Sequence, residues 1–474
     1  MKPLGGKLAR AWTHVGPRML PFADVATDEL PLGRLLRLSL FQGSVGMAVV
    51  LLTGTLNRVM IVELAVPAWL VASMVSLPLF FAPFRALVGF RSDAYRSALG
   101  WRRVPFIWFG SLMQFGGLAI MPFALLVLSG DTHGPVVFGQ VGAALAFLLV
   151  GAGMHTTQTA GLALATDLAR PDLRPRIVAL LFVTLLVGML VSALVFGWLL
   201  ADFTQLKLIK VVQGAAVVTM VLNGIALWKQ EVRRPDRVVD DTDFRKAWRT
   251  LMADPRAGRL LAAVALGTAG FTMQDILLEP YGGQILGMSV SQTTSLTALL
   301  AAGMLVAFVL AARRIGTGMD PHRLAAYGAT IGIAAFTIVT FVTVLQSPYV
   351  FGLGVALIGV GSGLFAVGTL TAAMDLAQDG NSGIALGAWG AVQATAAGVA
   401  IAAGGILRDF VDSLVANEAL GPALTSASTG YAVVYQIEVV LLFATLVAIG
   451  PLAAFAGRAN HQREKPLGLA QFPS

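Results

Sequence analysis

Asp275 and Glu279 are two carboxylates within one of the most apolar stretches of the chain, GFTMQDILLEPYGGQILG at 270–287. They are four residues apart, so a helix would place them on one face. No Lys or Arg lies between Arg259 and Arg313 to pair with them. In the simplest interpretation Glu279 reaches interfacial water and Asp275 accepts a hydrogen bond. The sharper hypotheses are an ion pair with a distant cation, a proton-linked role, or contact with a bound group.

His155, in the sequence GMHTTQT, is the one histidine inside a predicted membrane span. A neutral imidazole within a membrane can bond across helices, relay a proton or ligate a metal, and a purely structural histidine is equally open. Asp275 and Glu438 are the only carboxylates clearly within the predicted spans, and no Lys or Arg lies at mid-span. This scarcity of mid-span charge argues against a pathway for a charged solute.

The composition places these residues in a membrane protein. Hydrophobic residues make up 57% of the 474 residues and charged residues 12%, with a mean hydropathy of +0.78. A soluble domain is typically about 45–50% apolar, glycine included, and about 25% charged. The absence of cysteine excludes disulfides, cysteine-ligated iron–sulfur clusters and thiolate zinc sites. We found no nucleotide-binding glycine loop, metal cluster or Ser/His/Asp set at membrane depth, so we expect no enzyme activity and no metal site.

Apolar runs of about 20 residues, the length that crosses a bilayer as a helix, occur twelve times. In the first half of the chain they lie near 35–57, 66–88, 104–128, 136–165, 176–201 and 206–228. In the second half they lie near 258–280, 291–312, 324–346, 349–374, 383–407 and 431–456, and the stretch 270–287 can extend the seventh span outward. The sequence therefore predicts an all-α membrane protein with 12 transmembrane helices.

The basic residues indicate the orientation of these spans. Of 33 Lys and Arg, only four fall on the side opposite the termini, and these are Arg58, Lys207, Lys210 and Arg408. By the positive-inside rule both termini are cytoplasmic. Membrane topology therefore explains the pI near 10, and no nucleic-acid partner is expected.

The chain divides into two six-helix halves. The predicted parts are a cytoplasmic N-terminal arm (1–34), a first half (35–228), a cytoplasmic central loop (229–257), a second half (258–456) and a cytoplasmic tail (457–474). The fourth and tenth spans look like copies, because LVGAGMHTTQTAGLALATDLA (149–169) and LIGVGSGLFAVGTLTAAMDLA (357–377) share Gly-x-Gly and a final Asp-Leu-Ala. Two six-helix repeats in parallel are the architecture of major facilitator transporters.

A loop motif supports the same architecture. The second loop, GFRSDAYRSALGWRR, resembles the cytoplasmic G-x-x-x-D-(R/K)-x-G-(R/K)-(R/K) motif of that superfamily, with four extra residues before the final part. A weaker copy, GTGMDPHR, occupies the matching loop of the second half. A carboxylate there can cap helix N–H groups while arginines meet carbonyl ends or lipid phosphates, and an ordinary basic loop is the alternative. The motif residues are Gly89, Asp93, Gly100, Arg102 and Arg103, with Gly316, Asp320 and Arg323 in the copy.

Four stretches carry a more specific resemblance. The segments at 21–64 and 87–125, together with TMQDILLEPYGGQILG and AMDLA (373–377), resemble the PucC family, also called the bacteriochlorophyll delivery family. The resemblance covers essentially the whole chain and is closer to the LhaA-type members than to PucC proper. It implies a major facilitator fold and a role as an assembly factor for the light-harvesting antenna complexes of a phototrophic bacterium.

The resemblance also implies partners and a location. The partners are antenna polypeptides, those of the core antenna before those of the peripheral antenna, with the reaction centre complex and the lipid bilayer as further partners. The location is the inner, intracytoplasmic membrane. Bacteriochlorophyll is the implied cofactor, and its magnesium needs one axial ligand, for which His155, Asp275 and Glu279 are candidates. A secondary transporter of a hydrophobic or tetrapyrrole solute, proton-linked through Asp275, is the alternative function.

Arg58 adds a hypothesis about gating. In the major facilitator arrangement the first and seventh spans face each other, so this outer cation is placed to pair with Asp275 or Glu279. We take Arg58 and Glu279 as the candidate pair that closes the outer side of the cavity.

Overall fold

The structure is a computed structural model that describes residues 30–80, 101–130, 135–170, 174–231, 252–253, 255–376, 382–421 and 424–463. Within these residues it is helical and contains no strand. The first half comprises α2 (Leu32–Val49), π-helical η2 (Val50–Thr55), α3 (Leu56–Arg58), π-helical η3 (Val59–Glu63), α4 (Ala68–Phe80), α6 (Val104–Leu128), α7 (Val136–Leu168), α8 (Arg174–Leu199) and α9 (Gln205–Leu227). The second half comprises α11 (Pro255–Thr272), the 3₁₀ turn η5 (Met273–Ile276), α12 (Leu278–Gln284), α13 (Val290–Gly316), α14 (Pro321–Leu345), α15 (Pro348–Leu376), α16 (Ser382–Ala416) and α17 (Thr429–Arg463).

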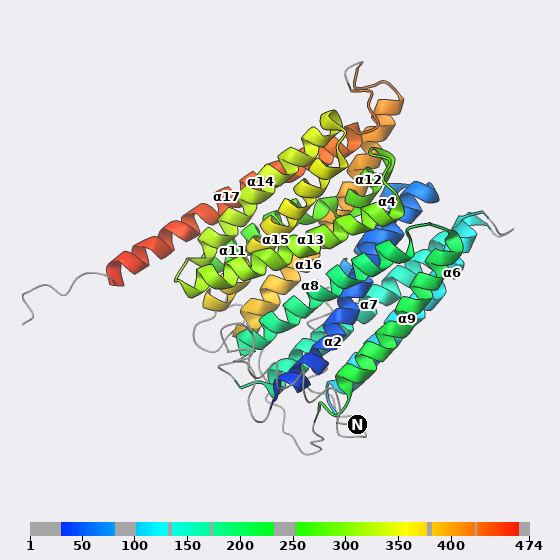
Figure 1. The fold of residues 1–474 in the computed structure, drawn as a ribbon. Coiled ribbons are helices and arrows are strands. Elements are labelled where there is room, and N and C mark those ends of the chain that lie inside the picture. The colour runs from blue at the N-terminus through cyan, green and yellow to red at the C-terminus, as the bar shows by residue number, and fades with distance from the viewer. Residues whose placement is uncertain are drawn as a thin grey trace, which may run out of the picture.

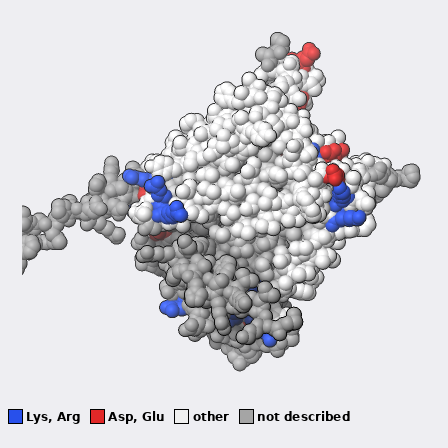
Figure 2. All heavy atoms as spheres, in the orientation of Figure 1, with Lys and Arg blue, Asp and Glu red and all other residues white. Residues whose placement is uncertain are grey.

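The predicted all-α membrane fold is confirmed. Among the described residues, 11 helical stretches are long and apolar enough to cross a membrane, and α4 is the described part of the second predicted span. The two halves lie side by side, with their long helices running between the same two ends of the molecule (Figure 1). Figure 2 shows a broad surface without charged side chains across the middle of the visible face. Exposed Trp198 (76%) and Phe138 (69%) are typical of such a lipid-facing surface.

Two spans differ from their predicted extents. The first runs from Leu32 to Glu63 rather than 35–57, because the π-helical turns η2 and η3 continue it beyond α2. The seventh runs from Pro255 to Gln284 and is interrupted at η5, so the stretch at 270–287 does extend it outward. Most of the extra length of both spans lies at the end of the molecule away from the start of α2, here called the distal end, where residues 64–67, 285–289, 417–421 and 424–428 also lie.

The repeated Gly-x-Gly has the same structural role in both halves. A Cβ on Gly153 of α7 would lie 2.4 Å from the carbonyl oxygen of Gly110 in α6. A Cβ on Gly361 of α15 would lie 2.8 Å from the carbonyl oxygen of Gly328 in α14. Each glycine therefore lets two backbones approach at a distance that no side chain permits, as small residues do between membrane helices.

The halves also meet each other closely toward the distal end. A Cβ on Gly405 of α16 would lie 2.8 Å from the carbonyl oxygen of Ala68, the first residue of α4. A Cβ on Gly197 of α8 would lie 3.3 Å from the carbonyl oxygen of Ser291 in α13.

Candidate functional site

The interruption of the seventh span positions both candidate carboxylates. Pro280 has no N–H to donate to the carbonyl of Ile276, and its ring would clash with that carbonyl in a regular helix. The chain accordingly leaves α11 at Thr272, forms the 3₁₀ turn η5 and restarts as α12 at Leu278. Asp275 lies in the turn and Glu279 in the first turn of α12. The four-residue spacing therefore does not fall on one continuous helix.

Both carboxylates nevertheless line one cavity of about 240 Å³ between the two halves. Helices α2, α8, α13, α15 and α16 supply most of the remaining wall, which is largely apolar. No described lining residue is basic. The polar side chains that line it are Thr53, Gln274, Thr297, Ser362 and Gln393, with Thr268 and Thr272.

Glu279 is buried to 1% exposure at a place where the two halves approach each other. Its Oε1 accepts a hydrogen bond from Thr297 Oγ1 of α13 at 2.5 Å. The same oxygen faces Gly54 in η2, where a Cβ would lie only 2.5 Å away. Residue 54 must therefore be glycine for the first span to pass the Glu279 carboxylate at this distance.

Asp275 belongs to a second carboxylate set that includes Glu438, a residue to which the sequence analysis assigned no role. Gln274 Nε2 donates to Asp275 Oδ1 at 2.6 Å, and the Gln274 backbone N–H donates to Glu438 Oε1 of α17 at 2.6 Å. The second bond satisfies an N–H that the interrupted helix leaves without its usual acceptor. In the sequence, Glu438 is recognisable only as a lone carboxylate in the last apolar span. Its hydrogen-bond partner, Gln274, is 164 residues away in the chain and could not be identified from local sequence.

Arg58 does not form the predicted ion pair with Glu279. Its Nη1 lies 2.5 Å from Glu63 Oε1, and its Nη2 donates to the carbonyl oxygen of Met288 at 3.2 Å. The physical reason is the π-helical turn η3, whose i to i+5 spacing brings residue 63 alongside residue 58. Arg58 thus joins the first span to the segment that follows α12, while Glu279 turns into the cavity.

His155 lies on α7, buried at 9% exposure, and does not line the central cavity. It is held within the first half, next to the contact of α7 with α6 at Gly153. The structure therefore brings Asp275 and Glu279 together and leaves His155 apart.

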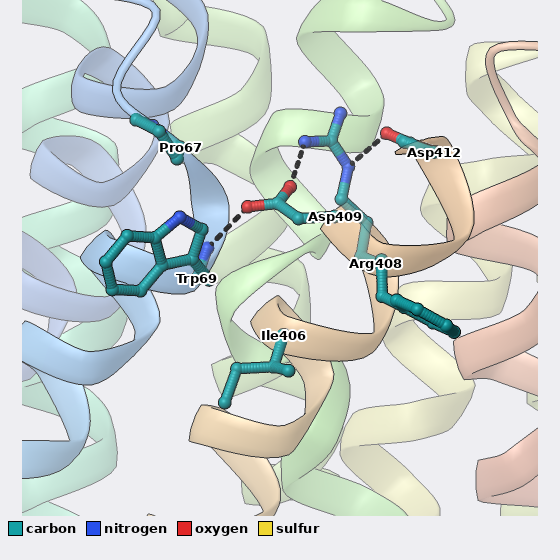
Figure 3. Close-up of a pocket in the computed structure, with 7 residues that line it drawn as sticks. Pro67, Trp69, Ile406, Arg408, Asp409 and Asp412 are labelled. Carbon is teal, nitrogen blue, oxygen red and sulfur yellow. Dashed lines mark hydrogen bonds and ion pairs between the residues drawn. The ribbon is translucent and has the colours of Figure 1, made fainter. Parts of the chain in front are cut away.

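A second cavity, of about 590 Å³, opens on the distal end where α4 meets α16. Figure 3 shows Arg408 between Asp409 and Asp412, with Asp409 reaching across to Trp69. The Trp69 backbone N–H donates to Asp409 Oδ2 at 2.7 Å, so a carboxylate of the second half caps the start of α4. Arg408 lies 2.7 Å from Asp409 and 3.0 Å from Asp412.

The described part of the loop motif forms a network at the end of the molecule where the chain enters α2. Arg102 and Arg103 both pair with Asp167, the aspartate of the first Asp-Leu-Ala, and the Arg103 Nε distance is 3.1 Å. Glu231 accepts the backbone N–H groups of Arg102 and Val104 at 2.7 and 2.9 Å, which caps α6. Gly89, Asp93 and Gly100 lie outside the described residues.

The copy of the motif in the second half is built differently. Asp320 is the N-cap of α14 and accepts the His322 backbone N–H at 3.0 Å, while His322 Nδ1 lies 3.0 Å from the same oxygen. Gly316 is the last residue of α13, and Arg323 is exposed. The carboxylate thus caps a helix, as predicted for the motif, without an arginine pair in the described residues.

The central cavity does not fit a bacteriochlorophyll in this conformation. Pockets for drug-sized ligands have volumes of roughly 300–1,000 Å³, and a chlorin with its prenyl tail is larger than such ligands, whereas this cavity has about 240 Å³. Carboxylates suit magnesium as ligands, but Asp275 and Glu279 have no room beside them for the macrocycle.

Comparison with known proteins supports both the fold and the family. A solved bacterial homologue of the human lysosomal transporter Spinster, in an inward-facing conformation, matches with a TM-score of 0.66 at 16% identity, covering 89% of this chain and 96% of that one. This likeness shows the major facilitator fold and no more than the fold.

Close relatives are found among curated sequences. A Rhodobacter capsulatus protein described only by its place in the puhA-bchM intergenic region is 55% identical, covering 99% of this chain and 98% of its own length. Protein PucC of Rhodovulum sulfidophilum is 59% identical over 84% of this chain and 89% of its own length. The sequence model of the family described as PUCC protein matches residues 55–456, and the chain belongs to this family.

Proposed function

We propose that this protein is an assembly factor for bacterial light-harvesting antenna complexes. Its membership of the PucC family, over residues 55–456, is the observation that carries the proposal. The antenna role comes from the family resemblance of the sequence. Core antenna polypeptides are the proposed first clients, and the reaction centre complex is a further proposed partner.

The structure supports a role exercised on the outside of the bundle. The central cavity is small, whereas the sides of the bundle present large apolar side chains from both halves. Phe109 of α6 (66% exposed) and Val447 of α17 (74% exposed) are examples. A single-span antenna polypeptide can pack against such a surface through van der Waals contacts and small-residue approaches without a polar binding site.

The proposal also includes a place and a cargo. The protein would act in the intracytoplasmic membrane of a phototrophic bacterium, with both termini cytoplasmic, since the basic residues gather on the side of the termini. It would deliver bacteriochlorophyll by handling pigment together with the client polypeptide on the outer surface of the bundle.

Purification from a phototrophic host in mild detergent tests the assembly role. We expect antenna polypeptides to co-purify, and near-infrared absorption of bacteriochlorophyll to accompany them. The control is the same preparation from a strain without antenna subunits, in which the pigment signal should be lost. Pigment retained in that strain would show a site on the protein itself, and absence of both pigment and antenna would contradict the proposal.

The complete lack of cysteine permits a sharper experiment. Single cysteines at Phe109 and Val447 carry a photoactivatable cross-linker on opposite halves, and Ala201, in the exposed loop after α8, carries the matched control. A client docked on one half should cross-link from one apolar position and from neither the other half nor Ala201. Equal cross-linking from all three positions would indicate nonspecific contact in the membrane.

A secondary transporter is the second candidate, and the central cavity with its two carboxylates is the observation that favours it. Its solute would be hydrophobic or a tetrapyrrole fragment small enough for the cavity, moved together with a proton. Uptake into vesicles that contain only this purified protein distinguishes the two candidates, because an assembly factor requires its client polypeptides. Uptake abolished by Asp275→Asn in such vesicles would favour the transporter.

A further inference from the structure

Glu438, Gln274 and Asp275 form a continuous polar contact that runs from α17 to the central cavity. Glu438 is 0% exposed and Gln274 is 1% exposed. Glu438 Oε1 accepts the Gln274 backbone N–H at 2.6 Å, and the Gln274 side chain donates to Asp275 Oδ1 at 2.6 Å. Asp275 lines the cavity between the halves, whereas Glu438 is buried inside the second half. Gln274 bonds to both carboxylates and so links these two places.

These two carboxylates have no cation beside them among the described residues. The ion pairs of the described chain involve Arg58, Arg102, Arg103, Lys207, His322 and Arg408, and none of them reaches Asp275 or Glu438. Asp275 from η5 is the titratable group that interacts electrostatically with Glu438. Tyr435, on the same helix as Glu438, interacts with Glu438, with Tyr281 from α12 and with Tyr431 from α17. Two negative charges close together in a medium of low dielectric repel strongly, and each alone is costly to bury.

Several buried polar atoms around this contact lack a hydrogen-bond partner in the structure. They are Glu438 Oε2, Gln274 Oε1, and the hydroxyl oxygens of Tyr435 and Tyr281. All four side chains are at most 1% exposed. Buried polar groups are nearly always hydrogen-bonded, so this group of atoms is an independent indication that something binds there. A proton on Glu438 would supply one of the missing donors.

The same tyrosines lead toward the distal end. The Tyr281 ring lies 5.8 Å from the Tyr435 ring and 5.3 Å from the Tyr431 ring, measured between centroids. Tyr431 Oη donates to Gln284 Oε1 at 2.6 Å, and Arg408 Nη2 donates to the same oxygen at 2.8 Å. Arg408 lines the distal cavity (Figure 3). Three tyrosine rings in contact therefore extend from the residues of that cavity toward the surroundings of Glu438.

We propose that Glu438, Gln274 and Asp275 form a proton-binding site that exchanges with the distal end past Tyr431, Tyr281 and Tyr435. One proton from solvent converts one carboxylate of the pair to the acid and removes one of the two negative charges. Release of this proton from Asp275 into the central cavity restores the carboxylate, so the site gains and loses one proton in each passage. The inference concerns the protein itself and does not depend on an antenna client.

Infrared difference spectroscopy of the purified full-length protein in lipid nanodiscs tests the site. We expect a carbonyl band of a protonated carboxylic acid at neutral pH, which shifts in D₂O. Glu438→Gln and Asp275→Asn should each diminish or displace this band, and both substitutions keep the oxygen that accepts the Gln274 hydrogen bond. Glu418→Gln, at an exposed position, is the matched control and should leave the band unchanged.

Three results would overturn the proposal. The first is that the unmodified protein lacks the band, and the second is that the band persists unchanged in both variants. The third is that the band disappears when sodium replaces choline in the buffer, which would indicate a sodium site. Tyr435→Phe and Tyr281→Phe test the route, since loss of the hydroxyls should slow the rate at which the band shifts in D₂O. An unchanged rate in both would exclude the passage past these tyrosines.

Discussion

Apart from Arg58 and Arg103, which pair with carboxylates near the two ends of the first half, the two halves of the protein bury polar side chains of different kinds. In the first half Asn223 accepts from Ser44 and donates to Ser111, both at 2.8 Å, and Gln114 donates to Thr157 at 3.1 Å. In the second half the buried groups are carboxylates, Glu279 and Glu438, accompanied by Asp275. Neutral groups can satisfy one another and hold helices in register. A buried carboxylate without an ion-pair partner, such as Glu438, is stabilised by a proton or a ligand, so this difference is the basis of the site inferred above in the second half.

The close helix contacts at the repeated Gly-x-Gly are a feature that the two halves share, and breaking them should have the largest effect. Gly153→Leu and Gly361→Leu each force a side chain into a neighbouring backbone. We expect a loss of about 3 kcal/mol or more in the free energy of unfolding, or no folded protein at all. The yield of monodisperse protein and its thermal midpoint measure this. Gly116→Leu, which meets nothing within 4 Å, is the control. A stable Gly153→Leu protein would contradict the packing.

Exchanging the chemistry of the halves tests the comparison directly. Asn223→Asp removes the donor to Ser111 and places a charge among neutral groups, and it should cost about 2–3 kcal/mol. Asp275→Asn keeps the acceptor for Gln274 and should change stability by less than about 0.5 kcal/mol. Thermal unfolding of both variants in one detergent gives the two values. An equal loss of stability in the two variants would mean that the first half tolerates a buried carboxylate as well as the second half does.

Glu438 has a structural role as the acceptor of the Gln274 backbone N–H, and this role can be tested separately from its proposed role in proton binding. Glu438→Leu leaves the Gln274 N–H without an acceptor and should destabilise the protein by about 1–3 kcal/mol. Glu438→Gln keeps that acceptor and should unfold close to the unmodified temperature. Equal destabilisation by both substitutions would show that the negative charge, rather than the cap, holds the interrupted helix.

Arg58 tests which carboxylate pairs with the outer cation of the first half. Arg58→Glu breaks its ion pair with Glu63 and places a carboxylate beside Glu63 at a position where the Arg58 side chain is 5% exposed, so the loss should be about 3 kcal/mol. Adding Glu63→Arg should recover part of this loss, whereas adding Glu279→Arg should not. Thermal midpoints of the two double variants decide between the pairs. Recovery with Glu279→Arg alone would restore the gate first predicted from the sequence.

Much of the fold was predictable because the bilayer sets simple rules. Twelve apolar runs, the asymmetry of Lys and Arg, and the repeated Gly-x-Gly are local patterns that need no knowledge of partners. The interruption at η5 was not predicted, although Pro280 marks its place in the sequence. The reason is that Glu438, which accepts the Gln274 backbone N–H freed by the interruption, comes from the last span. The contact of Arg58 with Glu63 was not predicted for a similar reason, since π-helical turns leave little trace in sequence, and the gate pair of Arg58 with Glu279 stays a prediction.

The sequence by itself determined that the chain is a two-half helical membrane protein of the PucC family. It also determined that few charged residues lie within the apolar spans. Length, hydropathy and motif order are properties of the chain, so they can be read without coordinates. Tertiary structure alone decided that Asp275 and Glu279 share one cavity, that His155 stands apart, and that Glu438 joins Asp275 through Gln274. Such contacts depend on how helices from distant parts of the chain turn toward one another, and packing between helices sets that rotation.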